Sequence, residues 1–154
     1  IVSSIKFIPL LSGFFYSCSK IFEPDCTDCE NDTSLDQIRI NISDYPNLEE
    51  TEGAAALDAD EIEGLPAKGI LIYRKSEEEV LVYDRKCPHA KVQIGEFVDG
   101  ISTCLFGNGG HNSKFDTDGI RQSGPASCNL DSYPASIENN IITIFLNQKS
   151  DGCI

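Results

Sequence analysis

Short runs of β-branched and other apolar residues, separated by turn-forming residues, fill most of the chain between residues 36 and 147. Residues 38–42 alternate apolar and polar side chains, which is typical of a half-buried strand. Apolar runs at 68–74 and 79–84 are separated by a short charged stretch and predict a hairpin. No internal repeat is present. The pattern therefore predicts a small antiparallel β domain over residues 36–147.

Two dipeptides in this region favour tight turns. Asp99-Gly100 predicts a strand pair within residues 95–103, and Asn139-Asn140 predicts a last hairpin within residues 136–146. One segment differs, because residues 53–63 contain three consecutive alanines and predict a helix or helical turn. Long connections are left at residues 86–96 and 104–119.

The charge balance excludes one broad class of function. The chain of 154 residues has 12 lysines and arginines against 25 aspartates and glutamates, a net charge of −13. A surface this acidic repels phosphate backbones, so we expect no nucleic-acid partner.

The first 18 residues differ from the rest and predict an export segment. Lys6 precedes an uncharged run over residues 7–19, which is too short to span a bilayer but has the size of a secretory hydrophobic region. The run closes on Ser17-Cys18-Ser19, which resembles the lipobox of bacterial lipoproteins, and this resemblance implies lipidation of Cys18. We therefore expect a protein of the bacterial periplasm or cell envelope, held by a lipid anchor rather than a transmembrane helix. The alternative is a buried N-terminal helix or strand, and Pro9 and Gly13 disfavour a regular helix.

Residues 19–35 are acidic and predict a solvated tether. Cys26 and Cys29 lie within it, separated by two residues. Such a pair can be half of a zinc site or a redox pair, but zinc requires further ligands and a thioredoxin-like centre requires a βαβ setting. In an exported chain we expect a structural disulfide, either between Cys26 and Cys29 or from one of them to Cys153. Residues 148–154 are assigned to a C-terminal tail.

The two long connections contain the residues with metal-binding chemistry. Cys87 and His89 lie in the first connection, and Cys104 and His111 lie in the second. These are the only histidines of the chain, and both lie close to a cysteine in a loop that follows a predicted strand. Two cysteines and two histidines are ligands that iron–sulfur and zinc sites use. The alternative is that the histidines are surface residues and the cysteines are small buried side chains.

The residues around these loops resemble a Rieske domain over about residues 66–146. The resemblance rests on four stretches in the family's order: Cys87-Pro-His89, Asp99-Gly-Ile-Ser-Thr-Cys104, His111-Asn-Ser-Lys-Phe-Asp116 and Gly124-Pro-Ala126. It implies an all-β fold, an antiparallel sandwich or barrel with a small loop-built cluster-binding subdomain. It also implies a [2Fe–2S] cluster held by Cys87, His89, Cys104 and His111, with a Gly-Pro-Ala loop packed against it.

One departure from the family pattern leaves two alternatives. The family places its second cysteine three residues before the second histidine, where this chain has Asn108. Either Cys104 is the ligand and residues 106–109 are an insertion, or the ligand position has become Asn108 and the cluster is lost. In the second case Cys104 could pair with Cys128 in a disulfide, so the two uses of Cys104 exclude each other. A mononuclear zinc site built from the same four residues is a third hypothesis.

The resemblance implies one-electron transfer with a redox partner protein or a membrane quinone or cytochrome complex. The alternative is an interaction or structural lipoprotein that keeps the fold without a cluster. No nucleophile and base with suitable spacing are found in these residues, and we expect no second domain that could carry a mononuclear iron. We therefore expect an electron-transfer protein or an oxidoreductase component without a substrate site of its own.

Overall fold

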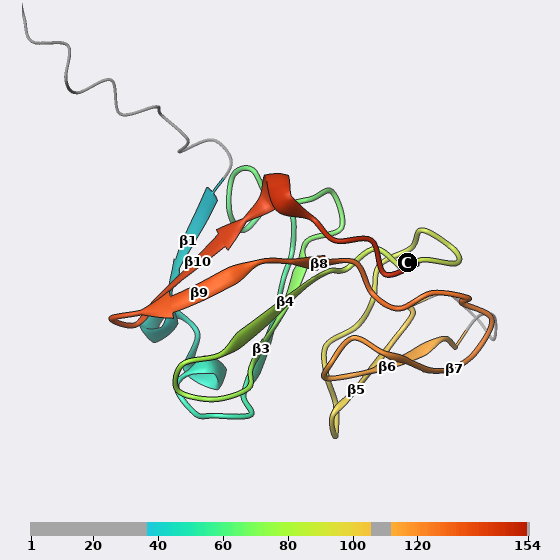
Figure 1. Cartoon of the computed structure of the whole chain (residues 1–154), viewed down its shortest axis with the longest axis horizontal. Helices are drawn as coiled ribbons and strands as arrows, with labels where there is room; N and C mark the ends of the chain where they lie inside the picture. The colour runs from blue at the N-terminus through green and yellow to red at the C-terminus, as the bar shows by residue number, and fades with distance from the viewer. Residues whose placement is uncertain (1–36, 106–111, 154) are drawn as a thin grey trace, which may run out of the picture. The chain divides into compact units, whose positions relative to one another are not determined.

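The computed structural model describes residues 37–105 and 112–153, which all belong to one compact unit spanning residues 32–154 (Figure 1). The described elements are β1 (Gln37–Asn41), η3 (Ile42–Asp44), η4 (Pro46–Leu48), β2 (Ala54–Leu57), β3 (Ile70–Arg74), β4 (Val80–Asp84), β5 (Ile101–Thr103), β6 (Lys114–Asp116), β7 (Arg121–Ser123), β8 (Ser132–Tyr133), β9 (Ala135–Glu138), β10 (Ile141–Phe145) and η5 (Leu146–Gln148). They form three antiparallel sheets with strand orders β1-β10-β9, β2-β3-β4-β8 and β5-β6-β7. The predicted all-β fold is confirmed.

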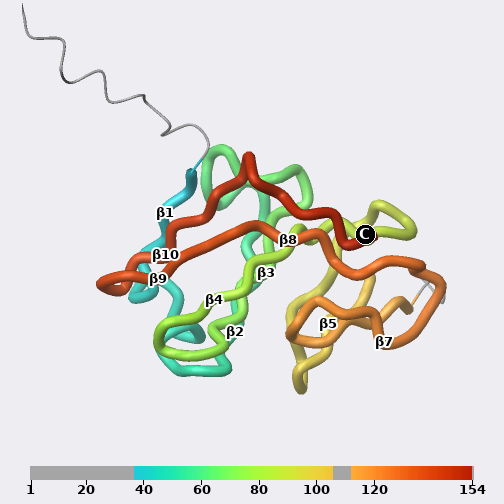
Figure 2. Tube along the Cα trace, viewed as in Figure 1, coloured from blue at the N-terminus to red at the C-terminus, as the bar shows by residue number. Residues whose placement is uncertain are grey.

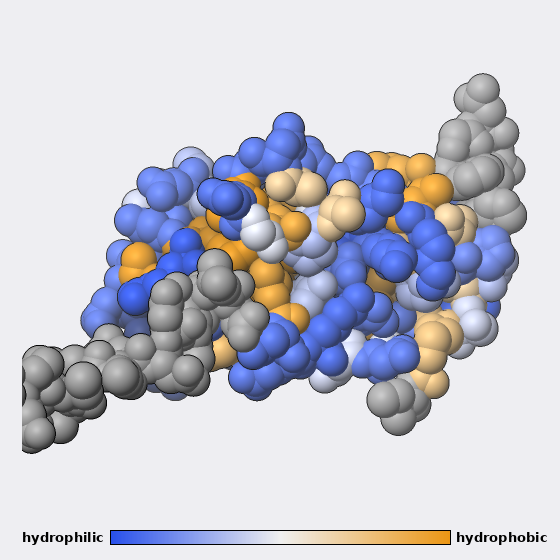
Figure 3. Space-filling view, turned by 90° about the horizontal axis from the view of Figure 1, so that it is seen from above, coloured by the Kyte–Doolittle hydropathy of each residue, from blue (hydrophilic) through white to orange (hydrophobic). Residues whose placement is uncertain are grey.

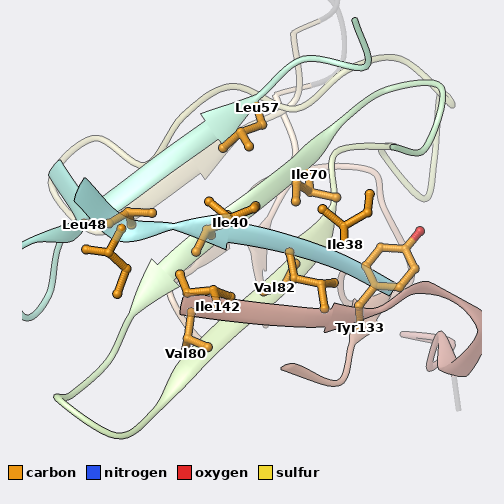
Figure 4. Packing of buried hydrophobic residues seen from close by; sticks show 12 residues of the cluster. Ile38, Ile40, Leu48, Leu57, Ile70, Val80, Val82, Tyr133 and Ile142 are labelled. Carbon is orange, nitrogen blue, oxygen red and sulfur yellow. The ribbon is translucent and has the colours of Figure 1, made fainter. Parts of the chain in front are cut away.

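The main hydrophobic core lies between the first two sheets. Ile40 from β1 and Ile142 from β10 pack with Ile70, Ile72 and side chains of β4 in one buried cluster (Figure 4). β1 keeps its alternating pattern because its other face is exposed, so its polar residues point to solvent. The burial of these aliphatic side chains supplies most of the free energy that holds the two sheets together.

Strands β3 and β4 are covered on both faces, which explains their continuous apolar runs. Ile72 and Val82 face the main core, whereas Leu71 and Tyr83 belong to a second buried cluster on the opposite face. A strand that is buried on both faces has no position for a polar side chain, so its sequence does not alternate. The second cluster also contains Cys87 and Cys104 and is the foundation of the candidate site.

The two turn dipeptides adopt the backbone conformation that their sequences predict. Asp99 and Gly100 have φ angles of 50° and 75°, and Val98 pairs with Ile101 across them. Asn139 and Asn140 have φ angles of 50° and 63° and join β9 to β10. Positive φ at two successive residues matches the twist of antiparallel strands.

The prediction of a helix over residues 53–63 is wrong. The alanines form β2, in which Ala55 pairs with Ile72 of β3, and the chain then passes through turns. At Gly53 a Cβ would lie 1.7 Å from the carbonyl oxygen of Asn47, so the chain enters β2 through a contact that only glycine allows. Pairing with the buried strand β3 outweighs the local helix preference of alanine.

The segment after η5 returns to the domain. Figure 2 shows it running back beside β8, where Ser150 pairs with Ser132. Residues 148–153, which the sequence predicts to be a tail, are therefore bonded to the domain. Within residues 37–105 and 112–153, no helix has the length and hydropathy that a membrane span requires. The face seen in Figure 3 is mostly hydrophilic, with apolar patches between the polar side chains.

Candidate metal centre

The first loop of the site follows β4 and folds back on itself around Cys87. The backbone N–H of Cys87 donates to the carbonyl of Val92 (2.8 Å), and the N–H of Lys91 donates to the carbonyl of Cys87 (2.9 Å). The buried guanidinium of Arg85 closes the base of the loop by donating from Nε to the carbonyl of Ile94 (3.0 Å). These bonds fix the backbone on both sides of Cys87.

The second loop is paired directly with the first. Ile94 and Cys104 form an antiparallel bridge, and the N–H of Leu105 donates to the carbonyl of Gln93 (2.9 Å). On its other side, the N–H of Cys104 donates to the carbonyl of Ser113 (3.0 Å). Cys104 is thus held between the first loop and the segment that leads into β6.

This pairing brings the two predicted cysteine ligands together. Cys87 and Cys104 are 0% and 3% exposed, belong to the same buried cluster and are both free thiols. Burial, together with a hydrogen bond and a charge interaction with Cys87, raises the pKa of Cys104 to about 12. Without a metal Cys104 therefore holds its proton, whereas a bound cation stabilises the thiolates that coordinate it.

Of the two predicted histidine ligands, only His89 lies within the described residues. His89 is exposed at the tip of the first loop, two residues after Cys87. His111 and Asn108 lie outside the described residues, as do Cys18, Cys26 and Cys29. Within the described part of the chain, no three histidine, cysteine, aspartate or glutamate side chains gather closely enough to hold a metal ion. The structure therefore assembles the cysteine half of the predicted ligand set.

A third loop, residues 124–126, packs against the second. The N–H of Ala126 donates to Oγ of Ser113 (3.0 Å), and both residues are buried. Gly124 has a φ of 89°, and a Cβ there would lie 2.4 Å from Cα of Ser113. Ser113 therefore links the second loop to the Gly-Pro-Ala loop, a role that sequence reasoning missed because nothing distinguishes a buried serine from an exposed one in a polar loop.

A disulfide joins Cys128 to Cys153. Of the pairings that the sequence left open, this bond excludes one from Cys26 or Cys29 to Cys153 and the alternative one between Cys104 and Cys128. The physical reason is the return of residues 149–153 to the segment after the third loop, which brings Cys153 to Cys128 and leaves Cys104 buried against Cys87. A bond between Cys26 and Cys29 lies outside the described residues and stays a prediction.

Comparison with known proteins identifies the family. The model of the Rieske [2Fe-2S] domain matches residues 44–134, which is more than half of the chain. The chain belongs to this Rieske family. The solved structure "Complex of reduced oxygenase and oxidized ferredoxin in carbazole 1,9a-dioxygenase" contains a chain of the same fold, with a TM-score of 0.53 and 14% identity, covering 76% of this chain and 99% of that one. No curated protein sequence matches significantly.

Family membership implies a [2Fe–2S] cluster as the cofactor. The described residues fit this group, because a Rieske cluster requires two thiolates side by side and two imidazoles. Cys87 and Cys104 supply two sulfur atoms within one buried cluster, where they are shielded from water. The exposed position of His89 is compatible with an imidazole ligand on the solvent side.

Proposed function

We propose that the protein is an exported Rieske electron carrier in which Cys87 and Cys104 hold one iron and His89 and His111 hold the other. The observation that carries this assignment is the buried pair of free thiols on two loops that are hydrogen-bonded to each other. The disulfide between Cys128 and Cys153 supports this assignment, because Cys128 is then unable to form a disulfide with Cys104.

The cluster supplies a one-electron centre whose potential lies between about −150 and +300 mV, because two neutral imidazoles replace two thiolates. The chain contributes the environment of that centre. Cys87 and Cys104 would bind one iron at a position shielded from water, because both lie among buried hydrophobic side chains that include Leu71 and Phe115. His89 extends to the surface, so an electron would enter or leave on the histidine side.

Export is the second part of the proposal. The lipobox-like Cys18 motivates it, and a disulfide within the domain supports it, because such bonds persist in oxidising compartments such as the periplasm. We propose a lipid anchor on Cys18 at a bacterial membrane. The partner would be a redox protein, as the complex of an oxygenase with a ferredoxin in the similar solved structure suggests, or a membrane quinone or cytochrome complex.

The test is metal analysis of the full chain prepared anaerobically with iron and sulfide. We expect two irons for each chain and an electron paramagnetic resonance signal after reduction. Cys104→Ser and His111→Ala should lose the iron and melt at a lower temperature, because metal binding contributes to the folding of both loops. Asn108→Ala is the matched control and should keep the iron.

Three outcomes would contradict the proposal. An iron-free wild-type chain would favour a cluster-less module, and zinc in place of iron would favour a mononuclear site. Loss of iron in Asn108→Ala, with iron retained in Cys104→Ser, would overturn the choice of Cys104. Export is tested separately, by mass analysis of the N-terminal peptide from membranes. An unmodified N-terminus in the soluble fraction would refute the anchor without affecting the metal assignment.

A further inference from the structure

The last described residues form a strap, defined here as residues 149–153, that lies against residues 128–132. Ser150 and Ser132 exchange two backbone hydrogen bonds (2.8 and 3.1 Å). The N–H of Asn129 donates to the carbonyl of Gly152 (3.1 Å). A Cβ at Gly152 would lie 2.3 Å from the carbonyl oxygen of Asn129. The strap therefore lies flush against this segment, and the disulfide from Cys153 fixes it covalently.

The beginning of the strap binds the strand that leads into the first loop. Nζ of Lys149 lies 2.6 Å from Oδ2 of Asp84 and 2.7 Å from Oδ2 of Asp131. Asp84 is buried at the end of β4, and its Oδ1 accepts a hydrogen bond from the N–H of Lys86, the residue before Cys87. Burial penalises the Lys149 charge, but its bonds to the two carboxylates outweigh that penalty and raise its pKa.

The other end of the strap acts on the third loop. Cys128 is two residues after Ala126, whose N–H donates to Oγ of Ser113, and the Ser113 carbonyl accepts from the N–H of Cys104. Ala126 and Leu130 pack in the same buried cluster as the two free cysteines. A continuous set of bonds thus runs from Cys153 through the third loop to Cys104.

We propose that the strap is a covalent clamp that positions the cysteine pocket, defined here as the buried side chains packed around Cys87 and Cys104. Lys149 holds the base of the first loop, and the Cys128–Cys153 disulfide holds the third loop against this cluster. Cys128, Cys153 and Lys149 are positioning residues, since none of them is a proposed ligand. The inference concerns the pocket itself and does not require that the cluster forms. It makes the closed pocket depend on a disulfide that stays intact only under oxidising conditions and whose Cys153 is exposed.

The dependence on oxidation can be written as a balanced step. A dithiol reductant attacks the disulfide, the S–S bond breaks, and Cys128 and Cys153 become thiols while the dithiol closes to its own disulfide. The third loop then remains attached by noncovalent contacts, which are its hydrogen bonds and the packing of Ala126. Re-oxidation by a disulfide oxidant reverses the step.

The experiment measures the alkylation of Cys87 and Cys104 in the iron-free full chain, with each cysteine followed by peptide mass mapping. In Cys153→Ser we expect both to react about tenfold faster or more, because local opening becomes easier once the cross-link is gone. Dithiol treatment of the wild type, followed by removal of the dithiol, should give the same increase. Re-oxidation should restore slow labelling. Ser127→Ala, which alters the neighbour of Cys128 and keeps the disulfide, is the matched control and should label at the wild-type rate.

Hydrogen exchange separates a local effect from general unfolding. In Cys153→Ser the amides of Ala126 and Cys104 should lose more protection than the amide of Ile142 in the main core, which should lose only what the lower global stability removes. Unchanged labelling of both cysteines, with the disulfide shown to be absent, would overturn the proposal. Equal loss of protection at Ile142 and Ala126 would also overturn it, because the disulfide would then stabilise the whole domain rather than the pocket.

A second readout applies to the iron-loaded chain. Cys153→Ser should lose its iron faster than Ser127→Ala, and its paramagnetic resonance lines should broaden because the third loop no longer has one position. An iron-free wild type would refute the proposed function, yet the labelling comparison would still decide whether the clamp exists.

Discussion

Replacing Gly124 with alanine should open the contact between the Gly-Pro-Ala loop and the second loop. Gly124 has a φ of 89°, and an added Cβ would lie 2.4 Å from Cα of Ser113 and 2.7 Å from its backbone nitrogen. Both of these atoms belong to the backbone, so no side chain can rotate to make room. The loop must move away, and the buried bond from Ala126 N–H to Ser113 Oγ is then lost.

The size of the effect can be separated into two contributions. Positive φ costs a residue with a Cβ about 1–2 kcal/mol, and a buried donor without a partner costs about 1–3 kcal/mol. Gly64 is the matched control, because its φ is 91° but a Cβ there would meet nothing closer than Ile38 Cδ1 at 4.0 Å. Gly64→Ala should therefore lower the free energy of unfolding by about 1–2 kcal/mol and Gly124→Ala by about 2–5 kcal/mol.

Urea unfolding of the iron-free chain measures both variants on one scale, and iron content measures the pocket. We expect Gly124→Ala to bind less iron and Gly64→Ala to bind as much as the wild type. Equal destabilisation by the two substitutions, with equal iron, would refute the reasoning, because the backbone overlap at Gly124 would then have no consequence.

Three further predictions concern the strap and the core. Burial raises the pKa of Asp131, but bonds from Lys149 and a backbone N–H outweigh this effect and bring the pKa below its usual 3.8. The stability that the ionised carboxylate contributes is lost as the pH falls through the folded pKa, so in Lys149→Met the free energy of unfolding should depend less on pH in the acid range. An unchanged acid dependence would count against the ion pair. Leu57 is fully buried, so Leu57→Ala should lower the free energy of urea unfolding by about 2–5 kcal/mol. Val98 is 68% exposed, and Val98→Ala should change that free energy by no more than about 0.5 kcal/mol. Similar losses in the two variants would contradict the core assignment. Cys153→Ser removes a cross-link of sequence separation 25 and should cost about 3.5 kcal/mol by the chain-entropy relation; calorimetry showing no loss would contradict it.

Strand positions could be predicted wherever the local sequence pattern and the tertiary environment agree. The alternation of apolar and polar residues predicted β1, and the dipeptide Asn139-Asn140, with its two positive φ angles, predicted the β9–β10 hairpin. The short strands β6, β7 and β8 were missed, because strands of two or three residues are too short to display a period. β2 was mistaken for a helix because the pairing of Ala55 with Ile72 is a property of the sheet and not of the alanine run.

The site divides in the same way. Cys87 and Cys104 could be predicted as partners because a family pattern orders the loops around them, and the structure brings them together. The role of Ser113 could not be predicted, since it acts through burial and through a bond to a distant segment. Asp84 and Arg85 could be predicted to form buried ion pairs, because they are opposite charges at the end of an apolar strand, shortly before a candidate ligand.

The pairing of the cysteines shows how the tertiary fold decides a chemical question that the sequence leaves open. Cys153 had candidate partners at Cys26 and Cys29, and Cys104 had one at Cys128, and nothing in the spacing distinguishes these possibilities. The return of the chain beside β8 joins Cys153 to Cys128, so one disulfide excludes two of the pairings that the sequence left open. The two cysteines that remain free in the described part of the chain are the two that the loops bury together. The disulfide at Cys128 leaves the thiol of Cys104 available as a ligand, beside that of Cys87. Because the two uses of Cys104 exclude each other, the iron analysis of Cys104→Ser decides whether this thiol holds metal.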